Sequence, residues 1–176
     1  MARKIIYRAY FKSPLGLLSI TANEAAITGL SFVKSKKAKE KKNEVIKDCL
    51  KQLLEYFKRE RYDFNLILEQ TGTELQQRVW SELQKIPYGM TMSYLNMAKK
   101  IKNRTLSRPV GNASGQNNIP IIVPCHRLVG SNGDLTGYSG GIEKKKWLLE
   151  FENETVEPKL FSFKDDGKKP RTKRSK

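Results

Sequence analysis

Apolar and polar residues alternate near the start of the chain, as they do in half-buried strands. The alternation runs through residues 5–11 and 18–22, with a Ser-Pro-Leu-Gly turn signal between them, and a third apolar run spans residues 27–33. Period-two alternation bounded by turn residues is typical of a β-meander. The sequence therefore predicts a small antiparallel sheet over residues 4–33.

A helical period follows the next, lysine-rich stretch. Apolar residues recur three or four positions apart, which predicts an amphipathic helix over about residues 43–60. Cys49 lies inside this helix, where we expect it to pack rather than to react. An extended piece at residues 64–68 is expected to return to the sheet. These elements form a predicted N-terminal α/β domain at residues 1–70.

Short helices are predicted in the second part of the chain. Thr73 and Gln76 have the spacing of a capping box at the start of the first helix, and Pro87 lies in the turn that ends it. Ser93 is a suitable N-cap for the second helix. This second helix and a third one, which follows after a break at Asn103-Arg104, are both short, so the pair is compatible with a helix-turn-helix.

The third helix of this part is predicted from Val110 to about Gly115, with Ser107 as its N-cap and a proline in its first turn. A last helix covers residues 142–152. We place a C-terminal domain at residues 71–156 and a basic tail, expected to be flexible, at residues 157–176.

A strongly apolar run precedes the second cysteine of the chain. Ile121, Ile122 and Val123 are β-branched, and we interpret them as a buried strand that ends in a loop carrying Cys125. The predicted fold class is therefore mixed α/β (α+β). A small antiparallel sheet with a helix forms the N-terminal domain, and the C-terminal domain is mostly helical, with a helix-turn-helix and a cysteine-bearing strand or loop.

The charge of the chain favours a polyanionic partner. Lysine and arginine number 34 against 18 acidic residues, a formal net charge of +16, and nucleic acid is the first candidate. Part of this charge is concentrated in residues 34–42 and 164–176, which we interpret mainly as a solvated loop and tail. The tail is also compatible with a nuclear address or a non-specific DNA contact.

Membrane and secretion signals are not apparent in the pattern of apolar residues. No apolar stretch approaches the length of a membrane span, and the N-terminus lacks a segment of signal-peptide type. We expect an intracellular protein without a membrane partner, cytoplasmic and nucleoid-associated in a prokaryote or nuclear in a eukaryote.

The only histidine, His126, directly follows Cys125, one of two cysteines. A reactive cysteine must be a thiolate, and a neighbouring imidazole or guanidinium, here His126 and Arg127, lowers the pKa of the thiol toward that state. Alternatively, Cys125 is a small buried hydrophobe with a structural neighbour, and the tetrapeptide alone leaves both interpretations open. A single histidine makes a Cys/His zinc site implausible, and we expect no metal. A disulfide to Cys49 is not expected in a reducing compartment.

The run Pro124-Cys125-His126-Arg127 resembles the active-site signature of the O6-alkylguanine-DNA alkyltransferases, also called methylated-DNA–protein-cysteine methyltransferases. Further motifs keep the order and spacing of this family through the C-terminal half, whereas the N-terminal domain resembles it only in general character. These motifs are Gln77-Arg78-Val79-Trp80, Ile86-Pro87-Tyr88-Gly89, Ser93-Tyr94, Val110-Gly111-Asn112-Ala113, Thr136-Gly137-Tyr138-Ser139-Gly140-Gly141 and Lys146-Trp147-Leu148-Leu149.

The resemblance implies DNA repair by direct transfer. The alkyl group of O6-alkylguanine, and of O4-alkylthymine, would move to Cys125 and remain there, so that each protein reacts once and needs no cofactor. His126 would deprotonate Cys125 through a water, and Glu152 would orient His126. Tyr94 would donate a proton or a hydrogen bond to the leaving guanine. The expected partner is double-stranded DNA containing the damaged base, bound by a monomer.

The resemblance also implies how the damaged base is reached. The target nucleotide must be flipped out of the stack, and Arg108 would fill the gap. Ser93, Tyr94 and the small residues Gly111, Ala113 and Gly115 would lie at the DNA minor groove. The base pocket would be formed by Asn117, Val123, Leu128, Tyr138, Ser139 and Gly140, and Arg127 would hold the site together from behind the thiol.

Three other interpretations compete with direct repair. A non-catalytic sensor of alkylated DNA would bind damage without reacting, but members of that group replace the reactive cysteine, which is present here. An unrelated cysteine hydrolase would need an oxyanion hole, which nothing in the sequence suggests. A plain DNA-binding regulator would explain the charge and the helix pair, but not the set formed by Cys125, His126 and Glu152.

Overall fold

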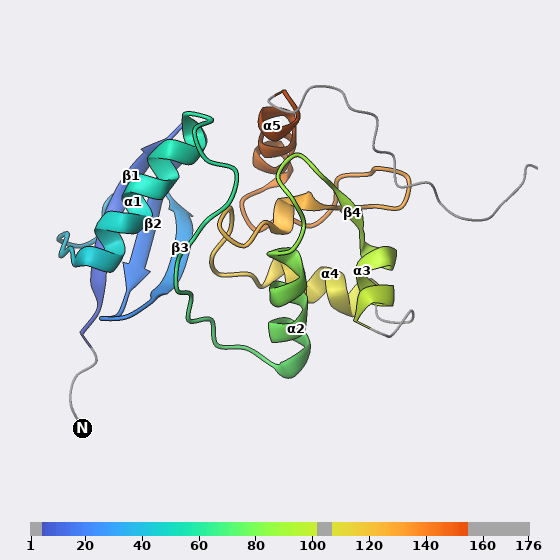
Figure 1. Ribbon diagram of the computed structural model, residues 1–176, viewed down its shortest axis with the longest axis horizontal. Helices are drawn as coiled ribbons and strands as arrows, with labels where there is room; N and C mark the ends of the chain where they lie inside the picture. Colours follow the sequence, from blue (N-terminus) through green and yellow to red (C-terminus); the bar gives the residue numbers. More distant parts are fainter. Residues whose placement is uncertain (1–4, 102–106, 155–176) are drawn as a thin grey trace, which may run out of the picture.

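Three antiparallel strands begin the fold in the computed structural model, which describes residues 5–101 and 107–154 (Figure 1). These strands are β1 (Tyr7–Ser13), β2 (Gly16–Ala22) and β3 (Ile27–Val33), paired in the order β1-β2-β3. Gly16 begins β2 directly after the turn and has a φ of +110°, a backbone region that favours glycine. The predicted meander is confirmed.

The helix α1 (Glu44–Phe57) packs against this sheet and confirms the predicted amphipathic helix. Asn43 caps it by accepting a hydrogen bond from the Ile46 backbone N–H at 3.0 Å. The buried face includes Cys49, whose thiol pKa is raised to about 12 by burial, so this cysteine packs as expected. Residues 64–68 reach the sheet through one parallel bridge to β3 rather than as a full strand.

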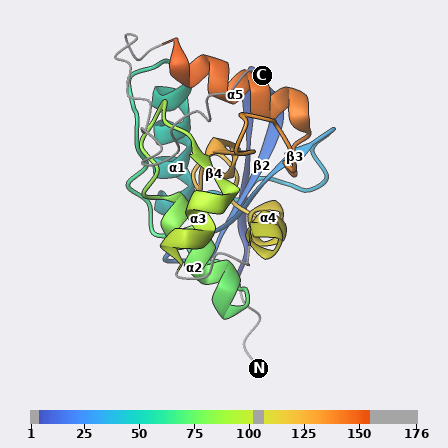
Figure 2. The same ribbon diagram turned by 90° about the vertical axis from the view of Figure 1, so that its right-hand side faces the viewer.

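The remaining helices follow in the second part of the chain. They are α2 (Glu74–Leu83), α3 (Tyr94–Lys100), α4 (Ser107–Gly115) and α5 (Ile142–Asn153). Both views place α3 and α4 together, and Figure 1 shows them on the side away from the three-stranded sheet (Figures 1 and 2). None of the helices in the described ranges is long and apolar enough to cross a membrane.

Side-chain caps start two of these helices as predicted. Thr73 forms the capping box of α2, and Ser93 accepts a hydrogen bond from the Asn96 backbone N–H at 3.1 Å at the start of α3. α4 begins at Ser107, so this serine lies inside the helix rather than before it, and the helix is longer than predicted. The predicted break at Asn103-Arg104 and the predicted tail at residues 157–176 lie outside the described residues.

Two connections fix the helix pair α3 and α4 relative to the rest of the C-terminal part. A short parallel pair, β4 (Met92–Ser93) and β5 (Leu128–Val129), joins the start of α3 to the segment after Cys125. The Trp80 Nε1 atom in α2 donates a hydrogen bond to the Ala113 carbonyl in α4 at 2.8 Å. The sequence pattern did not predict the strand pair, because a two-residue strand has no period.

The predicted strand at Ile121–Val123 is wrong. This segment is buried, but it forms a tight turn in which the Val123 N–H donates to the Ile119 carbonyl at 2.9 Å, and Cys125–Arg127 continues as a 3₁₀ turn, η2. Ile121 has a φ of +75°, which is rare for a β-branched residue. Prolines on either side of the run lack the N–H that a strand ladder needs. The apolar run therefore indicated burial, not extended structure.

The packing of α1 on the sheet predicts that replacing two adjacent leucines by alanine lowers the free energy of unfolding by different amounts. Leu53 is fully buried, whereas Leu54 is 47% exposed. Leu53→Ala is expected to lower the free energy of unfolding by about 2–5 kcal/mol, because it leaves a cavity in the core. Leu54→Ala is the matched control and should cost less than about 1 kcal/mol. Urea denaturation followed by circular dichroism measures both, and equal losses would contradict this orientation of α1.

Candidate active site

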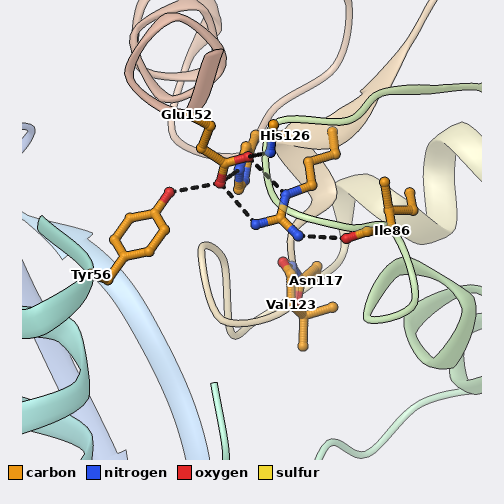
Figure 3. Close-up of polar contacts among 8 residues, drawn as sticks. Tyr56, Ile86, Asn117, Val123, His126 and Glu152 are labelled. Carbon is orange, nitrogen blue, oxygen red and sulfur yellow. Dashed lines mark hydrogen bonds and ion pairs between the residues drawn. The ribbon is translucent and has the colours of Figure 1, made fainter. Parts of the chain in front are cut away.

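Glu152, near the end of α5, is a buried carboxylate surrounded by donors (Figure 3). Its Oε1 atom lies 2.9 Å from the His126 Nε2 atom and 2.9 Å from Arg127 Nη2, and its Oε2 atom accepts from Arg127 Nε at 2.9 Å. The Tyr56 hydroxyl donates to Oε1 at 2.8 Å, and the Gly89 N–H donates to Oε2 at 3.1 Å. Burial alone would raise the pKa of Glu152, but His126 and Arg127 more than offset it and hold the pKa well below its usual range.

His126 is held as a neutral imidazole. Its side chain is fully buried, and burial lowers its pKa despite the opposing effect of Glu152. Because the ionised carboxylate of Glu152 accepts at Nε2, the hydrogen of the neutral ring belongs there, which leaves Nδ1 as an acceptor. Within the described residues Nδ1 has no hydrogen-bond partner. The ring therefore has one nitrogen anchored and one available to take a proton.

Cys125 opens the η2 turn and is only 2% exposed. The Asn117 Nδ2 atom lies 3.1 Å from its sulfur and also donates to the Val123 carbonyl at 2.8 Å. Burial raises the pKa of the Cys125 thiol to about 11, and Asn117 and Lys145 offset this only in part. The expected net lowering of this pKa by the imidazole and the guanidinium is wrong: a backbone hydrogen bond at His126 lowers it, but the His126 ring is neutral, Arg127 is paired with Glu152, and burial outweighs the lowering contacts.

Arg127 is buried behind this turn, where the sequence analysis expected it. Besides its two bonds to Glu152, its Nη1 atom donates to the Ile86 carbonyl at 2.5 Å (Figure 3). Its guanidinium also lies 5.8 Å from the centre of the Tyr88 ring. Arg127 therefore ties η2 to α5 and to the segment that follows α2.

Tyr94, the first residue of α3, belongs to a second polar cluster. Its hydroxyl donates to the Thr136 carbonyl at 2.9 Å, and the Lys145 Nζ atom lies 3.2 Å from the same hydroxyl and 2.6 Å from Thr136 O. Lys145 is fully buried, and burial lowers the pKa of its ammonium to about 8. Burial raises the pKa of Tyr94. The buried amine of Lys145 thus contacts the Tyr94 hydroxyl, the group that the family resemblance implies as the donor to the leaving guanine.

The DNA-binding candidates lie on and beside α4. Arg108 is exposed, and it lines an open hollow of about 540 Å³ together with Gly111, Tyr94 and the loop at Thr136 and Gly137. Ser93 is the N-cap of α3, and Gly115 is exposed at the end of α4.

Ala113 departs from the predicted DNA-binding set. Its side chain is buried against the core, on the face of α4 whose backbone accepts the Trp80 hydrogen bond. The small size of Ala113 therefore serves helix packing within the protein, and its expected role at the DNA minor groove stays a prediction.

The residues predicted to form the base pocket are only partly brought together. Asn117 contacts Cys125, but the side chains of Val123 and Leu128 are fully buried in the core. Tyr138 is buried, and its hydroxyl has no partner among the described residues. Gly140 has a packing reason, because a Cβ atom there would lie 2.7 Å from the rings of Phe32 and Tyr138. Ser139 is exposed and lines a hollow of about 390 Å³ beside β2 and β3.

Sequence reasoning missed two residues of the site, Tyr56 and Lys145. Lys145 stands among three consecutive lysines, which look like a solvated face, yet it lies three and seven positions before the buried Leu148 and Glu152. Tyr56 follows the buried Leu53 by three positions. Helical spacing therefore indicated that both side chains are buried, but it did not indicate that Tyr56 contacts Glu152 or that Lys145 contacts Tyr94. No group of three or more metal-ligating side chains occurs in the described part of the chain.

Two family models match the chain. One, described as the ribonuclease-like domain of 6-O-methylguanine DNA methyltransferase, matches residues 6–70, and the other, described as the DNA-binding domain of the same protein, matches residues 74–154. A methylated-DNA–protein-cysteine methyltransferase of Methanosarcina acetivorans is 41% identical over 153 residues, which cover 84% of this chain and 98% of the relative.

Solved structures agree with these matches. The O6-methylguanine methyltransferase of Mycobacterium tuberculosis is 37% identical, with a TM-score of 0.79 over 89% of this chain and 98% of that one. A structure of the Mycobacterium tuberculosis protein OGT in complex with DNA is 39% identical, with a TM-score of 0.78 over 85% of this chain and 94% of that one. On these matches, the chain belongs to the methylated-DNA–protein-cysteine methyltransferase family.

Proposed function

We propose that this protein repairs DNA by transferring an alkyl group from O6-alkylguanine, and from O4-alkylthymine, to Cys125 in a single irreversible event. Family membership supports the reaction, and the relative bound to DNA supports the partner. The observation that carries the proposal is the buried contact of 2.9 Å between His126 and Glu152, directly after Cys125. It provides a base whose second nitrogen is available.

The thiol is neutral before the reaction, because its pKa is about 11. In the proposed step its proton passes to His126 Nδ1 through a water, and the resulting imidazolium is stabilised by the ionised Glu152. The sulfur then attacks the alkyl carbon and forms the new S–C bond, while the C–O6 bond breaks and its electron pair goes to the guanine. Protonated His126 is thus formed next to the Glu152 carboxylate, which already holds a negative charge.

Tyr94 completes the proton balance on the other side of the reaction. Its hydroxyl gives a proton to the leaving guanine ring, which gains negative charge as the C–O6 bond breaks. The Tyr94 hydroxyl oxygen, which becomes the phenolate oxygen, lies 3.2 Å from the Lys145 Nζ atom. An ammonium at this distance stabilises a phenolate and can return a proton to it.

Binding to duplex DNA uses the α4 side of the molecule. The exposed Arg108 lies at the hollow that also holds Tyr94, so the proposed finger and the proposed proton donor share one opening. The net charge of +16 supports sequence-independent attraction to phosphates. We propose that one monomer acts on each lesion, on the nucleoid in a prokaryote or in the nucleus of a eukaryote.

The role of Cys125 is tested by intact-protein mass spectrometry after mixing with a duplex that contains one O6-methylguanine. We expect a gain of one methylene group per protein, mapped to Cys125. Cys125→Ser should lose transfer by several orders of magnitude, because a serine hydroxyl is a far weaker nucleophile here. Cys49→Ser is the matched control and should react normally. Damage-selective binding without any mass gain in the natural sequence would instead indicate a sensor.

The role of Arg108 is tested with two substrates. Arg108→Ala should slow repair of duplex O6-methylguanine by about 10–100-fold, because unstacking a base costs a few kcal/mol. Reaction with free O6-benzylguanine requires no flipping and should change little. Lys99→Ala removes an equal charge from the exposed surface of α3 and serves as the control. A loss of equal size on both substrates would argue against the finger role.

The raised pKa of Cys125 predicts the pH dependence of its reactivity in the free protein. Since only the thiolate reacts, labelling of Cys125 by iodoacetamide should rise about tenfold per pH unit from pH 7 to pH 9, and it should continue to rise toward a pKa of about 11. Peptide mapping by mass spectrometry measures this rate, with Cys49 as an internal comparison. A rate that levels off below pH 8 would contradict a neutral thiol.

A further inference from the structure

Tyr56 brings the N-terminal part of the chain into direct contact with the relay. It lies on α1, 96 residues before Glu152 in the sequence, and its hydroxyl donates to the Glu152 Oε1 atom at 2.8 Å (Figure 3). The side chain is fully buried. None of the motifs that carry the family resemblance includes this residue.

The ring of Tyr56 is fixed by other aromatic side chains. Its centre lies 5.3 Å from that of Phe64, 5.9 Å from that of Tyr88 and 5.6 Å from that of Phe151. These contacts come from the segment after α1, the segment after α2 and α5. Because the ring is enclosed on several sides, its hydroxyl is directed at one place, the carboxylate of Glu152.

The hydroxyl shares its acceptor with the base of the relay. The Oε1 atom that accepts from Tyr56 is also the atom 2.9 Å from His126 Nε2 and 2.9 Å from Arg127 Nη2. Each donor on this oxygen offsets part of the carboxylate's negative charge, so a further donor leaves less of that charge to stabilise a protonated His126. Burial and the neighbouring Glu152 raise the pKa of Tyr56 well above its usual value, so the hydroxyl stays protonated and remains a donor.

We propose that Tyr56 is a positioning residue for the relay: its hydroxyl orients the Glu152 carboxylate and limits the proton affinity of His126. The N-terminal part of the chain then contributes to the chemical step and not only to stability. The consequence for repair rests on the proposed function, whereas the consequence for the proton affinity of His126 does not.

Several charged or titratable groups surround this pair. Glu152 and Lys145 face His126 from α5, Arg127 belongs to η2, and Cys125 precedes the ring in the chain. Tyr56 approaches the carboxylate from α1, and Tyr138 interacts with it from the loop before α5. Among these groups, the tyrosines are the ones whose polar group can be removed with the packing kept, because Tyr→Phe deletes only the hydroxyl.

The experiment uses Tyr56→Phe, which removes the hydroxyl and keeps the ring. Because His126 is the only histidine of the sequence, its pKa can be followed by NMR without ambiguity in a protein free of any histidine tag. Loss of the donor makes Glu152 a better acceptor, so the pKa of His126 should rise by about half to one unit. The acid limb of the rate of methyl transfer to Cys125 should move to higher pH by a similar amount.

Tyr10→Phe is the matched control. Tyr10 is also buried in the N-terminal part, and its hydroxyl accepts from the Lys37 and Ala38 backbone N–H groups at 3.0 and 3.1 Å, away from Glu152. This variant should leave the pKa of His126 and the acid limb unchanged. Thermal unfolding of both variants shows whether either loses stability.

The outcomes separate the two proposals. An unchanged pKa of His126 in Tyr56→Phe would overturn the positioning role, and so would a rate reduced by the same factor at every pH, which is the effect of a purely structural contact. If the natural sequence transfers no methyl group, the proposed function fails. A raised pKa of His126 would still support the positioning role of Tyr56 in that case.

Discussion

A buried carboxylate must be surrounded by hydrogen-bond donors, and the fold meets this requirement at Glu152. An unpaired charge in a protein interior costs several kcal/mol, so the donors must be in place whenever the chain is folded. They come from α1, from the segment after α2 and from η2, and the carboxylate itself comes from α5. Four parts of the chain are therefore held in one arrangement by a single charge, and the turn that carries Cys125 is among them.

The chemistry follows from how charge is divided around the buried thiol. In the proposed reaction, the negative charge of Glu152 stabilises the imidazolium that forms when His126 takes a proton. The positive charge of Lys145 lies beside Tyr94, where we propose that it stabilises the phenolate left after Tyr94 protonates the guanine. Both charges are present before the substrate binds, and burial strengthens their effect. The thiol itself is neutral before the reaction, because burial raises its pKa to about 11.

The sequence predicted much of this structure where the signal was local. The meander, the amphipathic α1 and the caps at Thr73 and Ser93 depend on neighbouring residues and were predicted correctly. The turn at residues 119–123 was not, because an apolar run reports burial without its backbone conformation. Contacts between distant residues, such as Tyr56 with Glu152, have no local signature. The lowered pKa predicted for Cys125 from its neighbours was wrong, because the side chains of His126 and Arg127 contact Glu152.

The contact between Tyr56 and Glu152 also places a geometric condition on α1. Successive residues of an α-helix are rotated by about 100° around its axis. Inserting or deleting one residue between the cap at Asn43 and Tyr56 would therefore turn the hydroxyl away from Glu152, even if the helix remained just as stable. The spacing between these two positions is set by a carboxylate at the far end of the chain. The proposed role of Tyr56 therefore makes the number of residues between these two positions a requirement of the relay, in addition to the stability of the helix.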